Sequence, residues 1–359
     1  MFWGAKIDKI HLFSLKKHTF LLFSFIFCPK FPIFAAEFKG KYHLVRHLRP
    51  IFVLIACLCL RLSSWAQYDP AFNHYWTLQT FYNPAASGLD GQLNVQGAYS
   101  MQMLGYTHAP KTMILTADIP LWMISPAHAA GAGFVNDEIG LFSHKKFYIQ
   151  YAFHQKMWGG RLSIGARAAM LAEGFDGSGL DLNDTGDNAF PTSDVNGTSF
   201  DLDGGLRFDA KKWYAGFSIL HSLSPIVTLG DTKANEYEVP ATFYLTGGYN
   251  ISLKNPLLKV QTSAIVRSDL KTWRGDVTAR LVYDGPRGKM YAGVGYSPTI
   301  STSIFIGGTF HGIQLGYCYE IYTGGIGALQ GTHEISLGYI TDLDLFKKGR
   351  NRHQSVRLL

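Results

Sequence analysis

Hydrophobic and polar residues alternate one by one through much of the last third of the chain. Within Gly312–Tyr322 every second residue is Ile, Leu or Tyr, and the residues between them are Gln, Gly, Cys and Glu. Asp276–Tyr283 and Thr332–Thr341 show the same period of two. Because successive side chains of a β-strand point to opposite faces, each of these runs predicts a strand with one apolar and one polar face.

The same pattern, followed along the chain, predicts fourteen strands after residue 90. The segment Gln67–Asp90 before them has no clear periodicity, and its Asn83-Pro84 and Ser87-Gly88 pairs predict turns. The predicted strands are 91–99, 111–119, 129–136, 145–156, 160–172, 198–209, 212–221, 240–252, 257–267, 275–284, 288–297, 301–309, 311–321 and 332–341.

Strands of this kind occur in two classes of protein. In a soluble sandwich the apolar faces of two sheets meet, whereas in a membrane barrel the apolar face meets lipid and the polar face lines the lumen. Most of the runs have the length of roughly 9–11 residues that a tilted strand needs to cross a bilayer, and their number is even. Aromatic residues also lie near strand ends, where interfacial girdles form: Trp213, Tyr291, Tyr296, Phe310, Tyr322 and Tyr339.

These features predict an all-β fold, a transmembrane outer-membrane β-barrel of about 14 antiparallel strands, with the soluble sandwich as the alternative. With the N-terminus in the periplasm, connections after even-numbered strands should be short. Most of them are, with Leu121–His128 as the exception. The longest loops, Glu173–Gly197 and Ser222–Val239, follow odd-numbered strands and are predicted to be extracellular.

Several charged residues fall on the polar faces of the predicted strands. They would be costly against lipid, so we expect them to pair with one another in the lumen. They are Arg161, Arg167, Asp201, Asp203, Arg207, Arg280 and Glu320.

The net charge of +7 is distributed unevenly. Residues 1–66 contain ten Lys and Arg against two Asp and Glu, and residues 347–359 contain five more basic residues. Residues 67–346 are therefore acidic overall. Because nucleic-acid binding depends on clustered Lys and Arg, we expect no nucleic-acid partner.

Residues 1–66 have the features of a leader. Lys41–Arg49 is basic, Ile51–Leu60 is apolar, and Ser64-Trp65-Ala66 ends in small residues, so we predict a secretory signal peptide cleaved before Gln67. A lipoprotein signal acylated at Cys57 is the alternative. A second apolar stretch lies upstream, within residues 1–40, which suggests that translation begins later than Met1.

One loop contains a candidate cation site. The run Asp181-Leu-Asn183-Asp184-Thr-Gly186-Asp187 spaces oxygen donors two apart before a glycine, but Thr192 stands where an EF-hand has its final Glu. We expect a solvated turn cluster there, with calcium binding as the alternative.

The chain offers no catalytic or metal constellation of the usual spacing. The histidines beyond the leader are scattered, and Cys318, which is the single cysteine there, is expected to be a small filler. His333, Glu334 and Ser336 have the residue types of a hydrolase, but His333 and Glu334 are neighbours on a strand and point to opposite faces. We therefore expect no enzyme activity, no metal and no cofactor.

Four stretches resemble the PorP/SprF family. These are outer-membrane proteins of the type IX secretion and gliding apparatus of Bacteroidetes. The stretches are Gln67-Tyr-Asp-Pro70, Tyr82-Asn-Pro-Ala-Ala-Ser-Gly88, Gly133-Phe-Val-Asn-Asp137 with Gly140, and Gly331-Thr-His-Glu-Ile-Ser-Leu-Gly-Tyr339. The motif positions are Asn83, Pro84, Gly88, His333 and Glu334, whose role the resemblance does not define.

The resemblance implies a non-enzymatic protein of the cell outer membrane. It would assist the secretion or surface attachment of large proteins with a type IX C-terminal signal domain. Its implied partners are such a secreted surface protein, periplasmic peptidoglycan-binding secretion components and outer-membrane lipid. A passive porin or solute channel of the same fold is the alternative.

The expected organisation has four parts. Residues 1–66 form the leader, 67–90 a periplasmic N-terminal segment, 91–346 the transmembrane barrel and 347–359 a basic C-terminal tail. The N-terminal segment and the tail are expected to face periplasmic proteins, and the two long loops to face the secreted protein.

Overall fold

The computed structural model describes residues 68–122, 124–125, 127–177, 194–230, 236–286, 288–323 and 331–342. All of them belong to the second of two compact units, Ser63–Leu359. The predicted leader, the basic tail and the candidate calcium site at Asp181–Asp187 lie outside the described residues.

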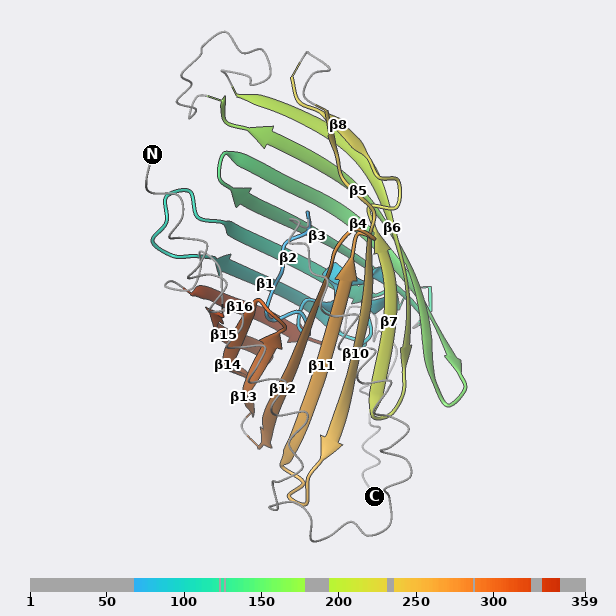
Figure 1. Cartoon of the computed structure of the whole chain (residues 1–359). Coiled ribbons are helices and arrows are strands. Elements are labelled where there is room, and N and C mark those ends of the chain that lie inside the picture. Colours follow the sequence, from blue (N-terminus) through green and yellow to red (C-terminus); the bar gives the residue numbers. More distant parts are fainter. Residues whose placement is uncertain are drawn as a thin grey trace, which may run out of the picture. The chain divides into compact units, whose positions relative to one another are not determined.

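Fourteen antiparallel strands form a closed barrel, in which β1 and β16 lie side by side and close the sheet (Figure 1). This confirms the predicted fold class. The barrel strands are β1 (Leu93–Met101), β2 (Lys111–Pro120), β3 (His128–Ile139), β4 (Phe142–Met157), β5 (Gly160–Phe175), β6 (Val195–Asp209), β7 (Trp213–Leu220), β10 (Thr242–Ser252), β11 (Leu258–Ser268), β12 (Trp273–Gly285), β13 (Gly288–Ser297), β14 (Ser301–Phe310), β15 (Ile313–Tyr322) and β16 (Thr332–Thr341).

Two short strands and two short helices lie outside this ladder. Strands β8 (Ile226–Thr228) and β9 (Glu236–Glu238) form a separate two-stranded sheet between β7 and β10. Helix α3 (Gln79–Tyr82) and the 3-10 helix η1 (Pro84–Ala86) precede β1. None of the described helices is long and apolar enough to cross a membrane.

Strands β3 to β6 extend further than the alternation predicts. β3 and β4 are joined across Gly140, which has a φ of +64°, and β5 pairs with β6 as far as Phe175 and Val195. The loop predicted at Glu173–Gly197 is therefore shorter than expected. At the end of β3, residues 136–138 are Asn-Asp-Glu, which are polar on both faces, so the period of two gives no signal where the strands extend beyond the apolar band.

The apolar faces of the strands point outward. Ile149 is 69% exposed and Val294 is 56% exposed, whereas the neighbouring inward residue Gln150 is 5% exposed. A single closed barrel has no second sheet to cover its apolar outer face. Lipid therefore covers it, and the polar faces line the lumen, which makes the chain an outer-membrane β-barrel and excludes the soluble sandwich.

This orientation leads to a first prediction. Ile149 lies near the middle of β4 on the outer face, so an Ile149→Arg substitution would place a charge in the hydrocarbon. We expect the free energy of unfolding in lipid vesicles to fall by about 2–4 kcal/mol. Ile149→Leu is the control and should change little. A similar loss for both variants would contradict the assignment of this face to lipid.

The two ends of the barrel differ. At the end where β1 begins and β16 finishes, several connections are tight, such as residues 158–159 and 311–312. We call this the short-turn end, and the opposite end, which carries the long connections from β5 to β6 and from β7 to β10, the long-loop end. In outer-membrane barrels the short turns face the periplasm.

Candidate functional site

The barrel is not empty, because residues 68–90 lie in its lumen. We call Tyr68–Asp90 the luminal segment. Tyr68 donates from its hydroxyl to Glu173 at the long-loop end, and the backbone N–H of Gly88 donates to Asp118 at the short-turn end, 2.6 Å away. The segment therefore runs the length of the lumen, whereas its sequence pattern predicts a position in the periplasm.

Aromatic packing explains why the segment lies inside. Its large side chains form one buried cluster with inward-facing residues of the wall, including Tyr148, Tyr244 and Phe305. The segment contributes Phe72, Tyr75, Trp76, Leu78, Phe81 and Tyr82 to this cluster. Burial of this apolar surface is a driving force that a periplasmic position would lack.

Glu334 on β16 holds the first half of the luminal segment. Its carboxylate is fully buried and accepts the backbone N–H groups of Asn73 at 2.7 Å and of His74 at 2.8 Å. The Nδ1 atom of His74 lies 2.6 Å from the same carboxylate. Glu320 on the neighbouring strand accepts the Asn73 side-chain amide at 3.0 Å. The motif residue Glu334 thus binds backbone amides of the luminal segment, and this structural role accounts for a buried carboxylate at its position.

Asn83 and Pro84 form the turn at the middle of the segment. The Asn83 side chain accepts the Ala85 N–H at 2.9 Å and caps η1, while its amide donates to the backbone carbonyl of Leu206 on β6 at 2.9 Å. Gly165 on β5 makes room for this turn, because a Cβ there would lie 2.3 Å from the Ala85 nitrogen. The Asn-Pro motif therefore packs directly against the backbone of β5 and β6, where Gly165 has no side chain in the way and the Leu206 carbonyl accepts from Asn83.

Gly88 ends the turn region in a conformation that suits glycine. Its φ is +68°, and a Cβ at this position would lie 2.3 Å from the Cβ of Ala129. Beside it, the Ser87 carbonyl oxygen lies 2.9 Å from Nε2 of His154, and the Ser87 hydroxyl accepts the Gln150 amide at 2.7 Å. The chain can leave the lumen here and enter β1 because Gly88 fits the space.

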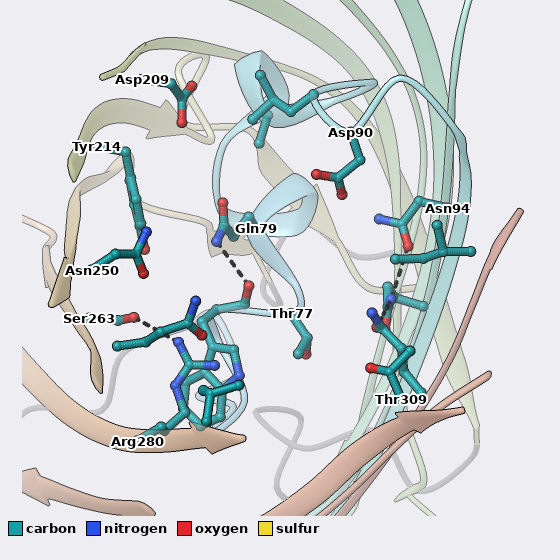
Figure 2. A pocket seen from close by; sticks show the side chains of 18 of the residues that line it. Thr77, Gln79, Asp90, Asn94, Asp209, Tyr214, Asn250, Ser263, Arg280 and Thr309 are labelled. Atoms are coloured by element: carbon teal, nitrogen blue, oxygen red, sulfur yellow. Dashed lines mark hydrogen bonds between the residues drawn. The ribbon is translucent and has the colours of Figure 1, made fainter. Parts of the chain in front are cut away.

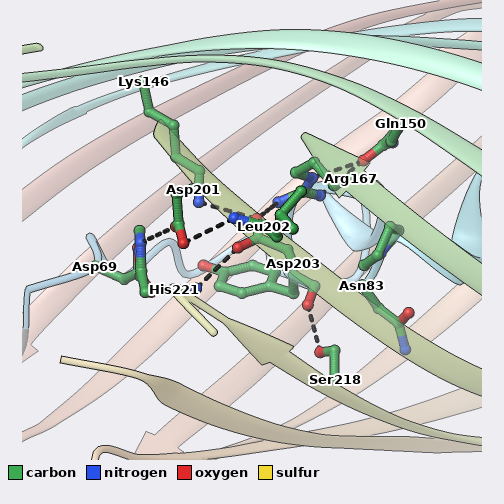
Figure 3. A network of polar contacts seen from close by, with 12 residues as sticks. Asp69, Asn83, Lys146, Gln150, Arg167, Asp201, Leu202, Asp203, Ser218 and His221 are labelled. Atoms are coloured by element: carbon green, nitrogen blue, oxygen red, sulfur yellow. Dashed lines mark hydrogen bonds and ion pairs between the residues drawn. The ribbon is translucent and has the colours of Figure 1, made fainter. Parts of the chain in front are cut away.

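A network of ion pairs holds the other end of the segment (Figure 3). Asp203 on β6 binds the Lys146 ammonium at 3.0 Å and the Arg167 guanidinium at 3.2 Å. Asp203 also accepts the backbone N–H of His221, at 2.8 Å. Arg167 donates in addition to Gln150. These five residues come from β4, β5 and β6 and from the position after β7.

The His221 ring extends the network to the luminal segment. Its Nδ1 lies 2.6 Å from Asp201 and its Nε2 lies 3.0 Å from Asp69, and all three side chains are buried. The Tyr244 hydroxyl donates to the second Asp69 oxygen at 2.7 Å. Both ring nitrogens can donate only when the ring carries two protons, so this arrangement favours the imidazolium. Asp69 is therefore held by charge.

A metal ion is not required at this point. Asp201, Asp203 and His221 place ligand atoms within 4.8 Å of one another, which geometrically would allow an ion. However, Lys146 and Arg167 already pair with Asp203. An ion would add positive charge beside them, so a hydrogen-bonded network accounts for the cluster.

The charge of His221 gives a second prediction. Burial and the Lys146 ammonium lower the pKa of His221, but the Asp69 and Asp201 carboxylates outweigh them, so the pKa lies above its usual range. The stabilisation is complete below the unfolded value of about 6.5 and is lost as the pH rises through the raised folded-state pKa. We expect the hydrogen-exchange protection of the amides near Asp69, corrected for the intrinsic rate, to fall as the pH rises through that pKa.

A matched variant tests this assignment. His221→Gln keeps two polar atoms in the ring's place but has no proton to lose, so the protection near Asp69 should be weaker and independent of pH. A pH dependence equal to that of the unaltered protein would show that another group is responsible.

The remaining predicted residues separate into lumen and outer face. The expected pairing of the inward charges holds for Arg167 with Asp203 and for Arg207 with Asp209 at 2.9 Å. It does not hold for Arg161, which donates to the Leu89 carbonyl at 2.8 Å, or for Arg280, which donates to the Ser263 hydroxyl. Cys318 is a buried free cysteine within the aromatic cluster, as expected of a filler. His333 faces away from Glu334 and bonds the Tyr317 hydroxyl at 2.7 Å, so the pair shares no face.

A cavity lies between the luminal segment and the wall at the short-turn end (Figure 2). Its volume is about 460 Å³. Thr77 and Gln79 of the segment face Tyr214, Asn250 and other residues of the wall across it. Tyr291, predicted to lie in an interfacial girdle, instead packs inward against Trp76 with ring centroids 6.5 Å apart.

Sequence reasoning did not bring together the residues around Asp69. Asp201 and Asp203 are visible as alternate residues on a polar face, but their partner His221 follows the next strand and Asp69 lies far upstream. A signal was nevertheless present in Gly165, Gly205 and Gly216, since glycine at inward positions indicates that another part of the chain approaches the wall closely.

Solved structures with a similar fold include three outer-membrane proteins. A Pseudomonas aeruginosa FadL homologue is 13% identical, with a TM-score of 0.42 over 72% of this chain and 93% of its own. The Ralstonia pickettii toluene transporter TbuX is 11% identical, with a TM-score of 0.45 over 78% of this chain and 96% of its own. The Acinetobacter baumannii outer membrane protein Omp33 is 9% identical, with a TM-score of 0.38 over 70% of this chain and 98% of its own. At these TM-scores none of the three bears on what this chain binds.

No curated protein matches the chain. The family model described as "Type IX secretion system membrane protein PorP/SprF" matches residues 64–339. This range contains the luminal segment and all fourteen barrel strands up to the last residues of β16. The chain therefore belongs to the PorP/SprF family and is a membrane component of the type IX secretion system.

Proposed function

We propose that this protein assists the secretion or the surface attachment of large proteins that carry a type IX C-terminal signal domain. It does so as a non-enzymatic scaffold in the outer membrane. The observation that supports this role best is the filled lumen. A barrel whose interior is occupied by its own chain offers its two ends to other proteins rather than a path through its centre.

Each end has a proposed partner. The long-loop end, with the β8–β9 sheet, faces the secreted surface protein. The short-turn end faces periplasmic peptidoglycan-binding components of the secretion system. The basic tail at residues 347–359, which lies outside the described residues, is proposed to contribute to the periplasmic side.

Affinity purification from outer membranes tests this proposal. The tagged protein is extracted in mild detergent, and the proteins that accompany it are identified by mass spectrometry. We expect one large surface protein with a type IX signal domain together with peptidoglycan-binding periplasmic proteins. Recovery of a barrel without companions, from cells whose secretion is unaffected by its deletion, would contradict the proposal.

A passive solute channel is the second candidate. The cavity at the short-turn end favours it, because that cavity is polar and open to a small solute. The contacts of the luminal segment with Glu334, Arg167 and Asp118 oppose it, since they hold the segment at both ends and in the middle. Steady ion current through the unaltered protein in planar bilayers would favour this channel.

A further inference from the structure

Arg280 on β12 is a buried cation with few partners. It is 8% exposed, and among the described residues no carboxylate lies within ion-pair distance of it. Its Nη2 donates to the Ser263 hydroxyl at 3.2 Å, and its Nε has no described acceptor. The guanidinium plane covers the ring of Trp76, 4.1 Å from the ring centroid. A buried guanidinium with one hydrogen bond is costly unless something else satisfies it.

The neighbouring arginines of the lumen are better satisfied. Arg167 bonds Asp203, Gln150 and the Thr80 carbonyl. Arg274, on the same strand as Arg280, pairs with Asp276 at 3.1 Å. Arg267 on β11 also has an Nε without a described acceptor, but its Nη1 donates to the Asp69 and Pro70 carbonyl oxygens, and Arg267 does not line the cavity at the short-turn end. Among the described arginines of the wall, Arg280 is thus the one that both lacks acceptors and faces that cavity.

Arg280 faces the cavity at the short-turn end (Figure 2). The volume of about 460 Å³ lies within the range of small-molecule sites, roughly 300–1,000 Å³. Trp76 covers one face of the guanidinium and Nε is buried, so the terminal Nη1 and Nη2 remain to interact with a ligand. Two N–H donors of one guanidinium can bind the two oxygens of a carboxylate side by side.

The other lining residues limit the charge of a ligand. Arg207 is paired with Asp209, and Asp118 accepts from the Gly88 N–H and the Asn94 amide. Asp90 also lines the cavity. The cations Arg161 and Lys289 line it as well, so four cationic side chains stand against three carboxylates, which leaves the lining with a formal charge of +1. This balance favours a monoanion over a dianion or a polyanion such as a phosphate ester. Neutral amides and hydroxyls make up much of the rest of the lining, which suits a ligand with hydroxyl or amide groups.

We propose that this cavity binds a small monocarboxylate, of the size of one acidic sugar or a short acylated peptide, with its carboxylate on the Nη1 and Nη2 donors of Arg280. Trp76 belongs to the luminal segment and Arg280 to the wall. A bound ligand therefore contacts both and stabilises the seated segment by mass action. This site is independent of the proposed role in secretion.

Binding is tested by calorimetry on the full-length protein in detergent micelles with two matched pairs of probes. Glucuronate is compared with glucose, and N-acetylalanine with N-acetylalaninamide. We expect at least one acid to bind at least about tenfold more tightly than its neutral partner and to raise the thermal unfolding temperature of the barrel. Which acid binds more tightly distinguishes a sugar acid from a peptide. Equal affinity for acid and neutral partner in both pairs, or no binding of any probe, would overturn the proposal.

Two variants localise the site. Arg280→Gln should weaken binding of the acid at least about tenfold, whereas Arg274→Gln removes another luminal arginine that does not line the cavity and should leave the affinity unchanged. Unaltered binding by Arg280→Gln would also overturn the proposal. Because the comparison of acid with neutral partner uses the unaltered protein, the test holds even if Arg280→Gln fails to fold.

Discussion

Barrels without the luminal segment should conduct ions, whereas the unaltered protein should conduct little. In the structure Tyr68–Asp90 fills the lumen from the long-loop end to the short-turn end. The strand ladder, including the β1–β16 pairing, is formed by the barrel strands alone. Removal of residues 68–90 therefore leaves a closed wall around a water-filled interior. We expect single-channel conductance in planar bilayers to rise at least about tenfold.

A length-matched variant serves as the control for this deletion. Residues 68–90 are replaced by a Gly/Ser segment of equal length, which keeps the chain connection but removes the aromatic cluster and the Asn83 turn. We expect this variant to conduct as well, because specific packing and not mere chain length closes the lumen. An unaltered protein that already conducts as much as both variants would contradict the structural assignment of a filled lumen.

The second large effect is expected at Arg167. This is the largest of the fully buried side chains, and it bonds Gln150, Asp203 and the Thr80 carbonyl of the luminal segment while lying 4.1 Å above the Tyr148 ring. Arg167→Met would leave the Asp203 carboxylate with less positive charge in a buried site. We expect the free energy of unfolding by urea in lipid vesicles to fall by about 3–5 kcal/mol.

An exposed ion pair provides the comparison. Lys259 and Asp284 lie 3.3 Å apart, but their side chains are 32% and 40% exposed. Lys259→Met should therefore cost only about 0–1 kcal/mol. If both substitutions had the same small effect, the network around Asp203 would not contribute to stability. In the Arg167 variant we also expect faster proteolysis within residues 68–90, because the Thr80 carbonyl loses its donor.

The ladder was predictable because its information is local. Alternation in β5, where Ile164 and Met170 face out and Ser163 and Arg167 face in, is contained in one short run of sequence. All fourteen strands follow from such runs. The ends of β3 and β4 that extend past the membrane were not predictable in this way. Polar residues occupy both faces of the strands there, so the alternation of apolar and polar residues disappears.

The position of the luminal segment was not predictable from its own residues. It has no period, and its main contacts are distant in the chain: Asn73 and His74 bond Glu334, about 260 positions away. The resemblance to the PorP/SprF family marked Asn83, Pro84, Gly88, His333 and Glu334 as a set but did not show what connects them. The connection is steric, because Gly165 and Gly205 leave space that the Asn83 turn occupies. It is also polar, because the Asn83 amide donates to the Leu206 carbonyl.

The course of the luminal segment also restricts how the barrel can assemble. Tyr68 lies at one end of the lumen and Gly88 at the other, while β1 follows directly and forms the seam with β16, the last strand to be synthesised. The aromatic side chains that fill the interior make the segment bulkier than an extended backbone, so it could not easily thread into a barrel that had already closed. Closure of the seam should therefore come after the segment has settled against β4 to β7, so that the wall forms around it as around a template. In the unaltered protein the interior is then filled before the wall closes, so the segment sets the order of the two steps, whereas the pairing of the strands does not depend on it.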